Sequence, residues 1–304
     1  MTPLINKLVV VGIGLIGGSL AAALKSASVC GEVIGIALEQ ETCDQACQLG
    51  IVDRAFTSLE PIAADLGASD VIVVAVPTLA VGAVFEQIKA FIHDDITITD
   101  VASVKGSVLI SAQKIWGHAP HNLVLGHPIA GSERSGVMAA NAALYQNHRV
   151  ILTPLESTAD KHIQRVEAMW RAAGAEVLKM PVAEHDEVLA ATSHLPHAIA
   201  YSLVDTLAHD GENENIFRYA AGGFRDFTRI ASSDPRMWHD IMLANKTSVL
   251  SAIDLFSDNL ARLRQNIEAE DSDALLGVFT RAKIARDRFT QVMAEPKSRN
   301  EPAS

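Results

Sequence analysis

The stretch from Lys7 to Lys25 constrains the fold of this chain more than any other segment. An apolar run, Leu8 to Val11, stops at Gly12, and the glycines at 12, 14 and 17 then form Gly-x-Gly-x-x-Gly ahead of an Ala- and Leu-rich helical pattern. This order predicts a strand, a tight turn and a helix start. Gly12 allows the turn, Gly14 lets a pyrophosphate approach the backbone, and Gly17 lets the helix pack closely on the strand. The helix start offers free N–H groups to phosphate.

Two other interpretations compete for the same stretch. A lysine, an apolar core and the small residues Ala21 to Ala23 are typical of a secretory signal. The uncharged run from Leu8 to Leu24 also resembles a membrane span, although it is short and rich in glycine. The alternation of strands and helices that follows favours the dinucleotide-binding interpretation, because it makes the apolar run a central strand.

Composition narrows the class of protein. The 304 residues are enough for two domains, and 49% hydrophobic with 20% charged residues is a globular composition. A net charge of -11 argues against a nucleic-acid-binding surface. The three cysteines form no CxxC pair, which indicates a reducing, cytoplasmic location. No later segment has the pattern of a membrane helix, and no His, Cys and Asp cluster has metal-ligand spacing.

An alternation of strands and helices follows the glycine motif. It predicts an α/β fold with an N-terminal doubly wound, Rossmann-type nucleotide-binding domain over residues 1–181. The strands are expected at Val33–Ile36, 70–76, Ile96–Asp100, Leu123–Leu125, Arg149–Leu152 and Glu176–Lys179, with helices near 42–49, 80–92, 105–115 and 161–173.

Strand signals vanish from Ala183 onward. Helices are expected at about 183–209, 212–221, 234–266 and 272–293. An apolar stripe at helical spacing (Val188, Leu189, Ala191 and Thr192) predicts packing against another helix or subunit. We therefore expect residues 182–294 to form an all-helical substrate and dimerisation domain that makes the protein a homodimer. The polar tail, 295–304, is predicted to be disordered.

An acid after the second strand of such folds binds the adenosine ribose. The expected place holds Ala37, and Glu39 is the nearest acid, slightly late in the sequence. No arginine stands there to receive a 2′-phosphate, so we expect NAD, with NADP as the alternative. Glu39 can equally be a solvated residue before a helix.

Polar residues follow several predicted strands, where nucleotide folds bind their ligands. Ser103 and Lys105 follow one strand, His127 ends the next, and Ser132 lies just beyond. Taken alone, Ser103 is expected to cap the following helix and His127 to be structural. Their shared position at the cofactor edge is what suggests chemistry.

The helical half adds a second polar set. His194 and His197 lie within one turn, with Pro196 expected to bend the helix between them. An irregular stretch is expected after Gly223, carrying Arg229, which suits carboxylate binding, and Asp234 is expected to cap the next helix.

Five motifs in order resemble the prephenate/arogenate (cyclohexadienyl) dehydrogenase family of tyrosine biosynthesis. They are Gly-x-Gly-x-x-Gly-Gly-Ser, Ser103-Val-Lys-Gly106, His127-Pro-Ile-Ala-Gly131, Ser193-His-Leu-Pro-His197, and Gly222-Gly-Phe-Arg-Asp-Phe-Thr-Arg229 followed by Ser233-Asp-Pro-Arg-Met-Trp238. The resemblance implies oxidative decarboxylation of prephenate to 4-hydroxyphenylpyruvate, or of arogenate to tyrosine, with hydride transfer to NAD(P).

The resemblance also assigns roles to residues. It implies that His127 is the catalytic base and that Ser103 holds it in register with the nicotinamide. It implies substrate binding by Arg229, Ser132, His197 and Trp238, the last from a second subunit, and acidic positions at Glu133 and Asp226 near the pocket entrance. The dinucleotide is expected at Gly12, Ile13, Gly14, Leu15, Ile16, Gly17, Glu39, Val76, Pro77 and Ser103.

Two other functions fit the same two-domain plan. One is a β-hydroxy-acid dehydrogenase, which usually carries a catalytic lysine on the first long helix of its second domain, whereas residues 183–209 contain no lysine. The other is a non-catalytic NAD(P)-binding redox sensor, in which Ser103, His127 and Arg229 would be free to change. The sequence does not discriminate prephenate from arogenate, nor does it address inhibition by tyrosine.

Overall fold

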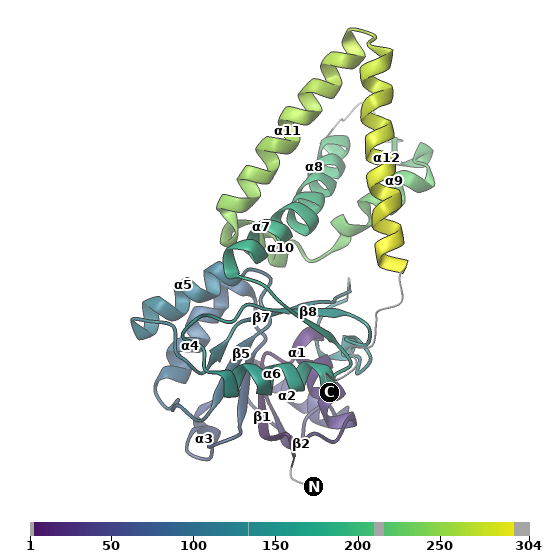
Figure 1. Cartoon of the computed structure of the whole chain (residues 1–304). Coiled ribbons are helices and arrows are strands. Elements are labelled where there is room, and N and C mark those ends of the chain that lie inside the picture. The colour runs from purple at the N-terminus through teal and green to yellow at the C-terminus, as the bar shows by residue number, and fades with distance from the viewer. Residues whose placement is uncertain (1–2, 133, 210–215, 295–304) are drawn as a thin grey trace. The chain divides into compact units, whose positions relative to one another are not determined.

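A computed structural model of the chain describes residues 3–132, 134–209 and 216–294 (Figure 1). Glu133, the first part of the helix expected at 212–221, and the tail expected to be disordered lie outside this range. Contacts divide the chain into two compact units, Met1–Val249 and Leu250–Ser304.

A six-stranded parallel sheet forms the centre of the first unit. Its strands lie in the order β3-β2-β1-β4-β5-β6, so the strand before the glycine motif is central, as predicted. The strands are β1 (Ile5–Val11), β2 (Cys30–Ile36), β3 (Arg54–Phe56), β4 (Val71–Val74), β5 (Thr97–Asp100) and β6 (Leu123–Val124).

Both faces of this sheet are buried. Within β1, Leu8 and Val10 belong to one apolar cluster, while Val9 and Val11 belong to another. Successive side chains of a strand point to opposite faces, so each cluster marks one covered face. An apolar run without polar alternation is what a parallel sheet covered on both sides requires.

Helices cover the two faces. Side chains of α1 and α6 join the first cluster, and those of α4 and α5 join the second. The helices of this region are α1 (Leu15–Ser26), α2 (Gln40–Gln48), α3 (Glu60–Ala63), α4 (Val81–Lys89), α5 (Lys105–Trp116) and α6 (Asp160–Ala172), with short 3-10 turns at Thr78–Ala80 and Val137–Ala139. The predicted doubly wound arrangement is confirmed for these strands.

The last three strands form a separate sheet. These strands, β7 (Gly126–Ile129), β8 (Arg149–Leu152) and β9 (Glu176–Lys179), lie in the order β7-β8-β9, with β7 antiparallel to β8. The sequence pattern had placed 149–152 and 176–179 in the main sheet and had ended a strand at Leu125. Strand pairing between distant segments carries no local signal, which is why the second sheet was missed.

The helical region is more broken than predicted. The expected helix at 183–209 consists of α7 (Val182–Leu189), a π-helix (Ala190–His194) and α8 (Leu195–His209). Pro196 lacks the N–H that would bond back to residue 192, and the wider turn directly before it accommodates this loss. Within one chain the expected apolar stripe is buried only in part, since Leu189 is buried and Val188 is 40% exposed, and its packing against a second subunit stays a prediction.

Two further helical differences appear towards the C-terminus. The stretch after Gly223 is not irregular but forms α9 (Gly222–Thr228), between 3-10 turns at Ile216–Tyr219 and Arg229–Ser232. The helix expected at 234–266 is divided at Asn245 into α10 (Pro235–Ala244) and α11 (Lys246–Glu268), and α12 (Ser272–Ala294) follows. Asp234 caps α10 as predicted, because its carboxylate accepts from the Met237 N–H at 2.9 Å.

Helices α11 and α12 run antiparallel on either side of a short turn (Figure 1). Within the described part of the chain, no helix is both long and apolar enough to cross a bilayer.

Candidate active site

The glycine motif forms the turn between β1 and α1. Gly12 has φ +99°, and a Cβ there would overlap the carbonyl oxygen of Ala75, while a Cβ at Gly17 would overlap that of Gly12. Nothing lies within 4 Å of the Cβ position at Gly14. These three observations match the three roles that a dinucleotide assigns to its glycines.

The helix that follows is open to an anion. Its N-cap is Gly14, which has no side chain that could occupy the free N–H groups, and the first turn carries no acidic residue. The first backbone N–H groups of a helix have no partner within the helix, and the space beside Gly14 is open, which fits the diphosphate of a dinucleotide. The Tyr145 hydroxyl donates to the Ile16 carbonyl at 2.5 Å and fixes the far side of this turn.

The other predicted cofactor residues follow neighbouring strands. Val76 and Pro77 come after β4, and the Ala75 N–H bonds to the Val11 carbonyl at 2.7 Å, so both loops leave the same edge of the sheet. Glu39 precedes α2, with an exposed side chain that makes no capping hydrogen bond. It is therefore available to a ligand at the end of β2.

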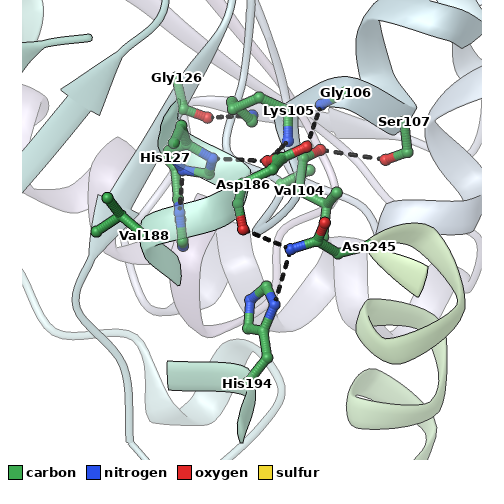
Figure 2. A network of polar contacts seen from close by, with 12 residues as sticks. Val104, Lys105, Gly106, Ser107, Gly126, His127, Asp186, Val188, His194 and Asn245 are labelled. Carbon is green, nitrogen blue, oxygen red and sulfur yellow. Dashed lines mark hydrogen bonds and ion pairs between the residues drawn. The ribbon is translucent and has the colours of Figure 1, made fainter. Parts of the chain in front are cut away.

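His127 begins a chain of buried polar contacts. Its Nδ1 lies 2.9 Å from Nε2 of His185, and Nδ1 of His185 lies 2.8 Å from Oδ1 of Asp186. His127 is supplied by β7 and the other two residues by α7. Figure 2 shows His127 and Asp186 converging with Lys105, Asn245 and His194.

Electrostatics keep these histidines neutral. Burial lowers the pKa of His127 well below its ordinary value, and the neighbouring His185, Lys105 and His194 lower it further. Burial also lowers the pKa of His185, against the opposing effect of its hydrogen bond to Asp186. A neutral imidazole is the form that can accept a proton.

Lys105 is a buried cation beneath the site. Its ammonium donates to a carboxylate oxygen of Asp100 and, at 2.5 Å, to the carbonyl of Gly126. Its side chain and that of Asp100 are both 0% exposed. Lys105 thus links the last residue of β5 to the first residue of β7. Removing either charge would leave the other buried and uncompensated, which is costly.

The cap of α5 differs from the prediction. Val104 is the N-cap, and Ser103 makes no side-chain hydrogen bond within the described structure. Instead the Asp186 carboxylate accepts from the Lys105 and Gly106 N–H groups at 2.9 and 2.8 Å. A carboxylate at a helix N-terminus satisfies its free amides and its dipole. Ser103 therefore stays half-buried and available at the end of β5.

The helical segments bring a second group of predicted residues together. The rings of His197 and Trp238 stack with centroids 3.5 Å apart, and Trp238 packs against Val104 beside Ser103. This contact lies within one chain, and the implied contribution of Trp238 to the pocket of a second subunit stays a prediction. Burial lowers the pKa of His197, its bond to the Ser193 carbonyl raises it, and the charge of Arg229 lowers it again.

Two other implied positions are exposed and make contacts within their own segments. Ser132 is exposed, and its hydroxyl accepts from the Arg134 N–H at 3.2 Å within its own loop. Asp226 is exposed and pairs with Arg225 at 3.5 Å. Across the described residues, no three His, Cys, Asp or Glu side chains are grouped to hold a metal ion.

Three residues of the site were not predicted from the sequence: His185, Asp186 and Asn245. The Asn245 side-chain amide donates to the Asp186 carbonyl at 2.8 Å and lies 3.2 Å from Nδ1 of His194. A signal for His185 was available, since Leu189 follows it by four residues and places both on the buried side of α7. No local pattern marks Asp186 or Asn245.

Comparisons with known proteins agree across the chain. A family model described as the prephenate dehydrogenase nucleotide-binding domain matches residues 20–179, and one described as the prephenate dehydrogenase dimerization domain matches residues 181–281. A prephenate dehydrogenase of Bacillus subtilis is 35% identical over 94% of this chain and 77% of its own length. A cyclohexadienyl dehydrogenase of Zymomonas mobilis is 36% identical over 92% of this chain and 95% of its own.

A solved structure shares the fold. The prephenate dehydrogenase from A. aeolicus, in complex with hydroxyphenyl propionate and NAD+, superimposes with a TM-score of 0.87 at 36% identity. The match covers 94% of this chain and 98% of that one.

Proposed function

Because the chain belongs to the prephenate dehydrogenase family, we propose that it catalyses the oxidative decarboxylation of prephenate, arogenate or both, with hydride transfer to NAD(P). The products are 4-hydroxyphenylpyruvate or tyrosine, together with CO2. The reaction is a step of tyrosine biosynthesis.

The observation that carries this proposal is His127, a buried histidine held neutral at the edge of the sheet. The reaction requires a base that takes the proton of the ring hydroxyl while hydride leaves the same carbon. A neutral imidazole does this at physiological pH. Ser103, half-buried at the end of β5, supplies a hydroxyl that can hold the substrate oxygen in register.

Arg229 is proposed to bind a substrate carboxylate. Guanidinium groups bind carboxylates through two parallel hydrogen bonds. A cation is needed, since the net charge of -11 repels a dianionic substrate. The charge of Arg229 lowers the pKa of His197, which stacks on Trp238, and this proximity supports a common role of the three side chains in binding substrate.

The proton balance needs no acid dedicated to decarboxylation. A bound nicotinamide would accept the hydride. His127 takes the hydroxyl proton, the ring loses its carboxyl group as CO2, and the electron pair that this leaves makes the ring aromatic. The phenolic oxygen then recovers the proton that His127 holds.

We propose NAD rather than NADP as the cofactor. Glu39 is exposed after β2, and an acid at this place suits the ribose hydroxyls. The segment from Ala37 to Gln40 contains no arginine that would favour a 2′-phosphate.

We also propose that the chain acts as a homodimer and that its functional division lies at 181/182. The family model over residues 181–281 carries the description of a dimerization domain. Residues of α11 and α12 that would suit such an interface are large, apolar and exposed: Leu255, Leu260, Ile267, Leu276 and Ile284.

A direct assay tests the function. The purified protein is mixed with prephenate or arogenate and with NAD or NADP, and absorbance of the reduced nicotinamide is followed. We expect turnover with at least one substrate and a higher kcat/KM with NAD. A β-hydroxy acid serves as the control substrate, and turnover with that compound alone would overturn the proposal.

A further inference from the structure

The buried chain from Asp186 to His127 has a definite proton order. We infer that His185 and Asp186 are positioning residues that fix the tautomer of His127, with a proton on Nδ1 and a lone pair on Nε2. The orientation follows from the hydrogen bonds themselves. Its use in catalysis rests on the proposed function.

The carboxylate of Asp186 is the fixed end of this chain of contacts. It accepts the N–H groups of Lys105 and Gly106, which can only donate. Burial raises the pKa of Asp186, but the hydrogen bonds from His185, Lys105 and Gly106 outweigh this effect and lower it. Asp186 is therefore ionised at neutral pH, and an ionised carboxylate only accepts.

The order of protons then follows along the chain. Nδ1 of His185, 2.8 Å from this carboxylate, must carry a proton. A neutral imidazole has one N–H, so Nε2 of His185 accepts. The donor to it is Nδ1 of His127, 2.9 Å away. A neutral His127 is thus left with a bare Nε2, which is the atom a general base needs.

The surrounding charges favour two neutral rings over a protonated one. Lys105 faces both histidines, with Asp100 paired to it, and His194 lies on the side of Asn245. Burial lowers the pKa of His194 to about 4, against the effect of Asp186, so it adds no positive charge near neutrality. Among the residues that the structure describes, the negative charge in direct contact with the pair is that of Asp186, on the His185 side.

The arrangement explains why two residues remote from the substrate should matter. If His127 carried its proton on Nε2, it could not accept the hydroxyl proton. In the Ser-His-Asp triad, replacing the orienting aspartate by asparagine lowers kcat about 10⁴-fold because the tautomer is wrong. Here an additional imidazole transmits the same orientation, and no proton has to reach Asp186.

The decisive measurement is made on the protein with its wild-type sequence. ¹⁵N NMR of histidine-labelled chain distinguishes protonated from bare ring nitrogens, and the His127→Asn variant identifies the His127 signals. At neutral pH we expect a protonated Nδ1 and a bare Nε2. A protonated Nε2 would overturn the inference. The NMR result holds whether or not prephenate is turned over, so the two proposals fail separately.

Two variants of His185 test the consequence. Asp186 is unsuitable because it also caps α5. His185→Gln retains a carbonyl that accepts from Nδ1 of His127, whereas His185→Leu offers no acceptor. We expect His185→Leu to lower kcat about 100-fold with little change in KM, and His185→Gln to stay within about tenfold of wild type.

The matched control is His162→Gln, which replaces another fully buried histidine, bonded to Thr97 at 2.7 Å and outside the chain of contacts. It should alter neither the kcat nor the ¹⁵N signals of His127. Equal losses of kcat in His185→Gln and His185→Leu, or wild-type tautomer signals in His185→Leu, would contradict the positioning role.

Discussion

The two compact units treat their apolar side chains in opposite ways. In the first, strands β1 and β4 have valines and leucines that are almost completely buried, such as Val10 and Val73 at 0% exposure. In the second, no residue from 250 to 291 is buried, and Leu260 and Leu276 are 53% and 65% exposed. The first unit thus completes its core by itself, while the second presents apolar surface that only another surface can cover.

Under the proposed homodimer, this difference separates the residues of the active site from those of the interface. Every candidate active-site residue, from Gly12 to Trp238, belongs to the first unit. We therefore expect changes there to act on each chain independently of protein concentration. Changes in the second unit should act through association, so their effects should depend on concentration.

The largest effect is expected at the base. His127→Asn should lower kcat about 10²- to 10⁴-fold, because the side chain no longer accepts the hydroxyl proton. NAD affinity, measured by titration calorimetry, should be unchanged, and the loss should be the same at all protein concentrations. The control is His148→Asn, at an exposed histidine directly before β8. A wild-type kcat in His127→Asn would exclude its role as base.

Next in size is an effect on assembly. Leu260→Asp should weaken self-association about 100-fold, since it buries a charge in an apolar contact. Sedimentation velocity over a range of concentrations measures it. Gln265→Glu, at an exposed polar position of the same helix, adds charge without removing apolar surface and should have little effect. If Leu260→Asp also unfolded the first unit, the expectation that changes in the second unit act through association alone would be wrong.

A smaller effect is expected for Arg229→Ala. Losing a charge-assisted contact to a carboxylate should raise the KM for substrate about 30-fold, with a modest change in kcat. Initial rates at saturating cofactor separate the two constants. Arg225→Ala is the control, because Arg225 is exposed and pairs with Asp226. An unchanged KM would assign the carboxylate contact to another residue.

The smallest effect concerns pH and stability. Burial lowers the pKa of His162 to about 4, as it does for His194. Below pH 6.5 these histidines are protonated in the unfolded chain but stay neutral in the folded chain. The free energy of unfolding therefore falls as the pH drops from 6.5 towards 4. The loss is about 1 kcal/mol per group between pH 6.5 and 5.5.

Urea unfolding at several pH values measures this slope. His162→Gln should flatten it, whereas His209→Gln, at an exposed histidine, should not. Residues 250–304 contain no histidine, so the slope belongs to the first unit. A stability that rises on acidification to pH 5.5 would contradict the prediction.

Local signals account for what the sequence predicted well. The apolar runs of β1 and β4, the turn at Gly12 and the Asp234 cap each depend on residues a few positions apart. The family motifs likewise lie in short segments. These features could be predicted because neighbouring residues determine them.

Contacts between distant segments account for what was missed. The Asp186 carboxylate caps a helix that begins 81 residues earlier, which is why Ser103 was wrongly expected to do so. His185 lies among acidic residues in α7, and its partner His127 is 58 residues away. The antiparallel pairing of β7 with β8 also joins segments that a loop separates.

Asn245 lies between the active-site residues and the helix α11 in the sequence. Its amide holds the backbone of Asp186, and α11, the helix that carries Leu260, starts at the next residue. The residue directly before α11 therefore holds the backbone of the same Asp186 whose carboxylate fixes the proton order towards His127.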